Sequence, residues 1–359
     1  MQENFSPEKI YPLPDFAYSS EDLCADTPHK KIPANWELLA SGRCAFLRAL
    51  SEMKKAGFSG RIFLPHYFCP SVVQFIGEFC RTEFFEDLPS EKSPRFDTLS
   101  PDDGDAVMAV DFFGLRDMRV WGEWKASNGK IFLVENASHA PFAKRAAGAD
   151  FRFGSLRKYL PLADGGFFET ANPSPIFRTP AASAPDFSAD FLAASNARKF
   201  DAEFAERLFY SAEAKISALK KAHRMGAYSF YALEHFDVEN ISQRRFAAVG
   251  AFAERARGNG FFRELNFSDD EMSPKPKKKM LCPVLKFESP KVRDGVYAAL
   301  RAHTPKMFAP IYWGGFCKNG SDAARAESAT MMCLPPHFAD TPAEAEAVCD
   351  FILNLCGRV

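Results

Sequence analysis

Apolar positions along the chain follow two different spacings. They recur at helical spacing over 44–56, 71–80 and 118–127. Between these segments lie short continuous apolar runs, which are typical of strands buried on both faces of a sheet, at 61–64, 83–85, 105–112, 130–135 and 165–168. Because strands and helices alternate along the chain, we predict an α/β fold with a mostly parallel sheet.

The pattern changes after Thr170. Residues 171–186 are rich in Pro, Ala and Ser and are typical of an extended surface segment. Long helical stretches follow over 187–224 and 238–258, and the chain ends with strands and with helices over 291–302 and 342–355. We therefore expect three parts, an N-terminal extension (1–35), a large domain (36–240) and a smaller α+β C-terminal domain (241–359).

Charge and composition narrow the range of partners. The 359 residues carry 45 basic and 46 acidic side chains, so no whole-chain field favours nucleic acid or an anionic membrane. No apolar run approaches the roughly 20 residues that a membrane-spanning helix needs. The segment from Met1 to Asp22 is acidic and contains proline, unlike a signal peptide. We expect a cytoplasmic protein.

The nine cysteines are an odd number, are scattered from Cys24 to Cys356 and include no C-x-x-C pair. A disulfide framework or a structural metal site is therefore not expected. We interpret most of the cysteines as small core residues in a reducing compartment.

The segment ADFRFGSLRKYLPLADGG, residues 149–166, carries the most informative chemistry. It places Lys158 three residues after Ser155, on a turn between strands. A pyridoxal phosphate (PLP) site needs a lysine that forms a Schiff base with the cofactor aldehyde and a hydroxyl that donates to the phosphate. Ser-x-x-Lys alone occurs often by chance, so the assignment needs support from elsewhere.

Three other segments give that support. The sequence Ser41-Gly42-Arg43 precedes a predicted helix, whose free N–H groups would bind phosphate. The run VDFFG ends a buried strand with a glycine turn over 110–114. The run LVENASHA, residues 133–140, places polar side chains past the carboxyl end of a strand, where α/β folds bind ligands.

The series SGR, LPHY, DFFGLRDM, LVENASHA and FGSLRKYLPLADGG resembles the DegT/DnrJ-like branch of the fold-type-I PLP-dependent aminotransferases, which typically act on nucleotide sugars. The resemblance covers about 36–170 and returns at Tyr312-Trp313 and over 333–338. It implies PLP as cofactor, an amino-acid donor and a keto acceptor such as a sugar, and a homodimer with active sites completed by the partner subunit.

The resemblance also implies roles for particular residues. Lys158 would be the Schiff-base lysine and the general base, and Ser155 would bind the phosphate together with the segment formed by Ser41, Gly42 and Arg43.

Around the cofactor ring, the resemblance places three further side chains. His139 would lie near the face of the cofactor ring or near its 3′-oxygen. The alternative is that His139 has only a structural role at the end of a strand. Tyr67 or Phe68 would stack on the ring, and we favour Tyr67. For either residue, the alternative is a purely structural role in the apolar core.

Two departures from the family stand out. The family has aspartate where this chain has Asn136, and aspartate keeps the pyridine nitrogen protonated. Glu135 cannot replace it, because adjacent strand residues point to opposite faces. The Asn-x-Arg-like loop that reaches the partner's substrate in the family is also absent, and residues 171–186 stand in its place.

Three functions remain open. The first is a PLP-dependent aminotransferase. The second is a catalytically impaired relative with a binding or regulatory role, which Asn136 and the absent loop favour. The third is a PLP enzyme of another reaction type, one that needs a less electron-poor ring.

Overall fold

The computed structural model describes residues 32–182, 185–197, 200–265, 280–303, 320–336 and 338–358. In these ranges the larger sheet has the strand order β1-β7-β6-β5-β4-β2-β3. Only β7 runs antiparallel to its neighbours, which confirms the predicted mostly parallel α/β fold. The strands are β1 (Trp36–Leu39), β2 (Arg61–Pro65), β3 (Arg81–Phe85), β4 (Ala106–Val110), β5 (Phe132–Asn136), β6 (Phe151–Ser155) and β7 (Gly166–Glu169).

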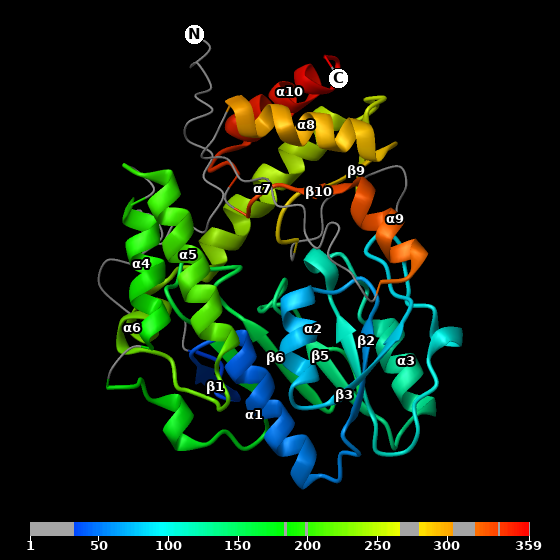
Figure 1. Cartoon of the computed structure of the whole chain (residues 1–359), viewed down its shortest axis with the longest axis vertical. Helices are drawn as coiled ribbons and strands as arrows, with labels where there is room; N and C mark the ends of the chain where they lie inside the picture. The colour runs from blue at the N-terminus through cyan, green and yellow to red at the C-terminus, as the bar shows by residue number, and fades with distance from the viewer. Residues whose placement is uncertain are drawn as a thin grey trace.

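Helices cover both faces of this sheet (Figure 1). All five residues of β4 are buried, and alternate ones enter separate apolar clusters. Met108 lies in the cluster that includes residues of α1 (Gly42–Lys55) and α2 (Pro70–Gly77), whereas Val107 lies with Trp121 of α3 (Arg119–Ser127). This alternation explains why the strand is continuously apolar in sequence.

The helical region after the sheet is more divided than the sequence pattern predicted. The stretch over 187–224 contains α4 (Asp186–Ala197) and α5 (Ala202–Ser217), which pack against each other. A further helix, α6 (Ala227–His235), lies where no pattern predicted one. Then α7 (Val238–Ala256) leads to the last part of the chain.

That last part forms a second layer of structure above the large sheet in the view of Figure 1. Its antiparallel strands have the order β10-β9-β8, and α7 packs on α10 with an ion pair between Arg255 and Asp350. The remaining elements are β8 (Phe262–Glu264), β9 (Val284–Phe287), α8 (Pro290–His303), α9 (Asp322–Thr330), β10 (Met331–Cys333) and α10 (Pro342–Cys356).

Several sequence features lie outside the described residues: most of the expected N-terminal extension, Tyr312-Trp313 and His337. Across the described ranges, every helix is too short or too polar to cross a membrane, and no cluster of His, Cys, Asp or Glu has the makeup of a metal site. The expected division into domains stays a prediction.

Candidate active site

The structure brings Lys158 and His139 together at the carboxyl edge of the large sheet. His139 lies on the loop that follows β5, and Lys158 lies on the turn that follows β6. Lys158 Nζ is 3.0 Å from His139 Nε2. His139 is buried and Lys158 is partly buried.

The hydrogen bonds of the imidazole fix where its proton lies. The backbone N–H of Phe113 donates to His139 Nδ1 at 3.1 Å, so Nδ1 carries no proton and the neutral ring is protonated on Nε2. The Nε2–H of His139 points at Lys158 Nζ. A protonated lysine has no lone pair on Nζ with which to accept this hydrogen bond. This hydrogen bond requires the lone pair of Nζ and so favours the neutral amine, and burial lowers the pKa of Lys158 below the ordinary value for lysine.

Burial also lowers the pKa of His139 well below its ordinary value, and the nearby charge of a protonated Lys158 would lower it further. The ring is thus neutral at physiological pH. Lys158 and His139 form one hydrogen-bonded pair, and an amine whose lone pair is free of a proton can attack a carbonyl carbon.

Phe113 holds this histidine through a strained turn. Its φ is +54°, the left-handed region that bulky residues rarely adopt, and it is the one non-glycine residue with positive φ among those described. The turn aims its N–H at Nδ1 and stacks its ring on the imidazole, with centroids 4.9 Å apart. Backbone strain of this kind concentrates at functional sites.

A close approach of backbone segments forms a cradle beside Lys158. Ser41 caps α1 by accepting from the Cys44 N–H, and Gly42 follows it. A methyl group on Gly42 would lie 3.1 Å from Ser155 Cβ, and one on Gly166 would overlap the Ser41 carbonyl. The predicted phosphate-binding residues therefore do lie together, around the amino end of a helix.

Arginine side chains surround the same cradle. Arg43 donates to Ser71 Oγ at 3.0 Å, and both Arg43 and Arg157 pair with Glu213 of α5, at 3.4 and 3.8 Å. The Arg157 guanidinium lies 3.5 Å from the centroid of the Phe191 ring. Burial lowers the pKa of Arg157 to about 10, so it stays charged at neutral pH.

This cluster has spare capacity for an anion. The Nε atoms of Arg43 and Arg157 are buried and have no hydrogen-bond partner. Two guanidinium groups also face one carboxylate, that of Glu213. A phosphate group would supply acceptors for both Nε atoms and negative charge beside both guanidinium groups, so these residues fit the cofactor phosphate.

Asn136 ends β5, and its side chain is held by its own loop. Asn136 Oδ1 accepts from the Ser138 N–H at 3.1 Å, and Ser138 Oγ accepts from the Ser155 N–H at 3.0 Å. Glu135 points to the other face of the sheet, where it pairs with Arg152, as expected for adjacent strand residues.

Tyr67 and Phe68 follow β2 and are both part of the apolar core. Tyr67 packs edge-on against Phe112, with ring centroids 5.8 Å apart. Their role as ring-stacking residues stays a prediction.

Comparisons with solved structures place this geometry in a known fold. The Helicobacter pylori aminotransferase PseC, of pseudoaminic acid biosynthesis, superposes over 90% of this chain and 87% of its own, with a TM-score of 0.62 and 12% identity. The chain shares the fold of sugar aminotransferases. This confirms the fold expected from the resemblance.

Further aminotransferase structures agree. A putative sugar aminotransferase from Streptococcus pneumoniae in its PMP form gives a TM-score of 0.60 at 13% identity, over 90% of this chain and 86% of that one. A DegT/DnrJ/EryC1/StrS aminotransferase from Brucella abortus gives a TM-score of 0.56 at 15% identity, over 90% of this chain and 85% of that one. No protein-family model and no curated sequence matches the chain.

Sequence reasoning did not assign roles to several residues of the site. Phe113 lies in the VDFFG turn, whose glycine was the only visible signal. Arg157 precedes the predicted lysine and reads as an ordinary surface cation, and Glu213 comes from a helix 55 residues away. Only the packing of α5 against this region brings the last two together.

Proposed function

We propose that the protein is a PLP-dependent aminotransferase that moves an amino group from an amino acid to a keto acceptor. The observation that carries this proposal is the Lys158 amine, 3.0 Å from His139 Nε2 and beside a cradle with unpartnered guanidinium nitrogens. A nucleophilic amine next to a phosphate-sized anion site is what PLP requires.

The residues divide the work as follows. Arg43, Arg157, the amino end of α1 and Ser155 bind the phosphate. Bound PLP supplies an aldehyde that condenses with amines and a ring that withdraws electrons. Lys158 Nζ would be the amine that meets this aldehyde and the base that moves the proton at the substrate α-carbon. His139 keeps Nζ oriented and neutral.

The aminotransferase neighbours support this assignment, and one of them was solved with PMP. They also support a sugar as the keto acceptor, because the pneumococcal protein is described as a putative sugar aminotransferase. A homodimer belongs to the same proposal, with a large domain over 36–240 and a smaller one over 241–359.

The proposal is tested by covalent labelling. Purified protein is mixed with PLP, reduced with borohydride and mapped by peptide mass spectrometry. We expect the phosphopyridoxyl group on Lys158 and no label in Lys158→Met. Lys286→Met removes a partly buried, ion-paired lysine far along the chain and should label normally. Labelling of a different lysine, or none, contradicts the proposal.

The same assay tests the anion cradle. Arg157→Met should raise the PLP concentration needed for half-maximal labelling about tenfold, because a charge-assisted hydrogen bond contributes about 1.5–3 kcal/mol. Labelling by pyridoxal, which lacks the phosphate, should change much less, because only the smaller effect of the Arg157 charge on Lys158 is then lost. An equal effect on both compounds would show that Arg157 does not bind the phosphate.

A second function follows from Asn136. Its amide is neutral and its Oδ1 already accepts from Ser138, so the side chain has no negative charge with which to hold a proton on the pyridine nitrogen. This favours a protein that binds PLP but transaminates slowly. Labelled protein whose absorbance does not respond to glutamate would support it.

A further inference from the structure

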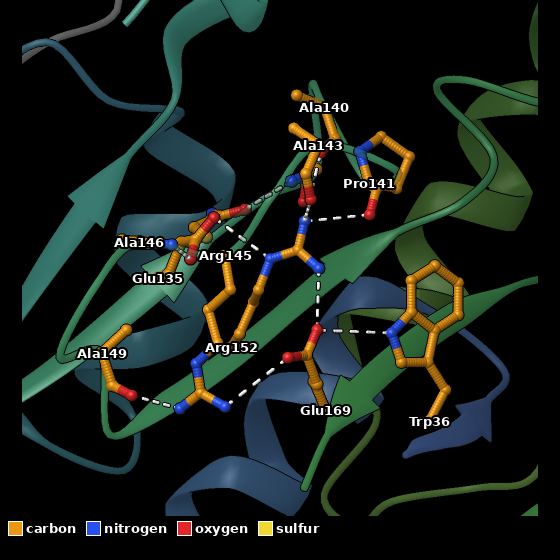
Figure 2. Close-up of polar contacts among 12 residues, drawn as sticks. Trp36, Glu135, Ala140, Pro141, Ala143, Arg145, Ala146, Ala149, Arg152 and Glu169 are labelled. Atoms are coloured by element: carbon orange, nitrogen blue, oxygen red, sulfur yellow. Dashed lines mark hydrogen bonds and ion pairs between the residues drawn. The ribbon is translucent and has the colours of Figure 1, made fainter. Parts of the chain in front are cut away.

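A buried arginine lies beneath the loop that carries His139. Arg152 of β6 is 2% exposed and pairs with Glu135 of β5 at 3.1 Å and with Glu169 of β7 at 2.9 Å (Figure 2). Its guanidinium also lies 5.2 Å from the centroid of the Phe167 ring. The two carboxylates, on strands either side of β6, fix the guanidinium plane from two directions.

The remaining arm of this guanidinium reaches the loop after β5. Arg152 Nη2 donates to three backbone carbonyls, those of Ala140 at 3.3 Å, Pro141 at 2.9 Å and Ala143 at 3.0 Å (Figure 2). Glu135 holds the far end of the same loop by accepting from the Ala146 N–H at 2.8 Å. The segment immediately after His139 is therefore fastened to the sheet through one side chain.

We propose that Arg152 is a positioning residue that acts through His139. By fastening the loop after β5 it holds the imidazole against Lys158 and keeps the lysine amine in its reactive, neutral form. The inference rests on the proposed function only in taking Lys158 as the reacting amine. Arg152 itself touches neither Lys158 nor the anion cradle in any contact described above.

Arg152 influences Lys158 by positioning the loop after β5 and not by its charge, because the charges around Arg152 are balanced. Two carboxylates, Glu135 and Glu169, face two guanidinium groups, since Arg145 also pairs with Glu169 at 3.5 Å. The charged and titratable groups that act on Lys158 come from elsewhere: Glu213 of α5, Arg43 of α1, Arg157 of its own turn, Cys69 at the start of α2 and His139.

The hydrogen bond between His139 and Lys158 determines in which direction the pKa of Lys158 moves when the loop is loosened. A donor that points at the lone pair of Nζ stabilises the neutral amine, so its loss raises the pKa of Lys158. A loosened loop also admits water, which stabilises the ammonium form and raises the pKa further. Both changes make the amine less reactive at neutral pH.

The test uses the full chain without PLP. Lys158 is modified with acetic anhydride over a range of pH, and its rate is read by peptide mass spectrometry. The midpoint of the profile gives the ionisation of the amine, and the plateau at high pH gives its accessibility. We expect Arg152→Lys, which keeps the charge but cannot span both carboxylates and three carbonyls, to raise the midpoint by about one unit. That shift is about a tenfold loss of neutral amine at neutral pH.

A double-mutant cycle separates positioning from general damage. His139→Ala should raise the midpoint, and adding Arg152→Lys to it should then change nothing further. Arg293→Met is the matched control, because Arg293 is also buried and donates to the carbonyls of Ser328 and Met331. It should lower the free energy of unfolding and leave the Lys158 midpoint unchanged.

Three results would overturn the inference: an unshifted midpoint in Arg152→Lys, a full extra shift in the double variant, or an equal shift in Arg293→Met. If Arg152→Lys does not fold, Glu169→Gln replaces it and should move the midpoint in the same direction by a smaller amount. The assay contains no PLP, so it can succeed even if labelling with PLP fails.

Discussion

We predict that Asn136 decides how strongly the ring of a bound PLP withdraws electrons. Its Oδ1 accepts from the Ser138 N–H, and a backbone donor leaves no ambiguity about which end of the amide is the oxygen. The side chain can offer a hydrogen bond but carries no negative charge that would hold a proton on the pyridine nitrogen. If Asn136 faces that nitrogen, we expect the nitrogen to be largely unprotonated, which would weaken the ring as an electron acceptor.

Asn136→Asp should reverse this. A carboxylate would still accept from Ser138 and would also stabilise a protonated pyridine nitrogen, so the first half of transamination with glutamate should accelerate. Each 1.4 kcal/mol of recovered stabilisation is about a tenfold gain in rate, measurable by single-turnover absorbance.

Asn128→Asp, at the carboxyl end of α3, is the control and should leave the rate unchanged. An unchanged or lower rate in Asn136→Asp, with PLP attached normally, would mean that the asparagine suits this protein's own reaction.

Among the elements, the contact of β7 with the amino end of α1 is the tightest part of the cradle. Gly166 opens β7 and pairs with Leu39 of β1, and it has no room for a Cβ because the Ser41 carbonyl occupies that position. Gly166→Ala should therefore separate β7 from the start of α1.

We expect Gly166→Ala to lower the free energy of unfolding by about 1–3 kcal/mol, the range for overpacked sites, and to weaken PLP labelling. Urea unfolding and the labelling assay measure the two effects. Gly129→Ala, where a Cβ would meet nothing within 4 Å, should be close to neutral. Equal stability of the two variants would show that the chain relaxes around the alanine.

The sequence predicts some strands and helices of the fold and misses others, for physical reasons. Strand β4 can be recognised in the sequence because all its residues are buried and apolar. Strand β6 cannot, because Arg152 and Gly154 interrupt its apolar pattern, and the arginine is buried with the help of ion pairs to two other strands. Helix α6 was missed because Tyr228 and Tyr231 are exposed and break the amphipathic pattern.

The residues of the candidate site, like the strands and helices, are predicted only where a local sequence motif marks them. Lys158, Ser155 and the start of α1 were predicted because they lie in local motifs, and the structure brings them together. The contacts of Phe113 with His139 and of Arg157 with Glu213 join segments far apart in the chain. No local spacing encodes such contacts.

For the whole molecule we predict a homodimer. The prediction rests on the resemblance, in which the partner completes each site, and on aromatic side chains that are exposed on α5 and α6, namely Phe204, Tyr210, Tyr228 and Tyr231. Exposed aromatic surface of this kind often marks an interface. Sedimentation at micromolar concentration should give about twice the 40.1 kDa chain mass, and a monomer would contradict the prediction.

The turn at Phe113 has a consequence for how the two parts of the molecule communicate. Its N–H binds His139, and its carbonyl accepts from the N–H of Leu281, which leads into β9. One peptide segment thus joins the reacting pair to the C-terminal strands. By thermodynamic reciprocity, a ligand that shifts Leu281 and thereby alters the affinity at Lys158 must have its own affinity altered by the same factor when Lys158 is occupied.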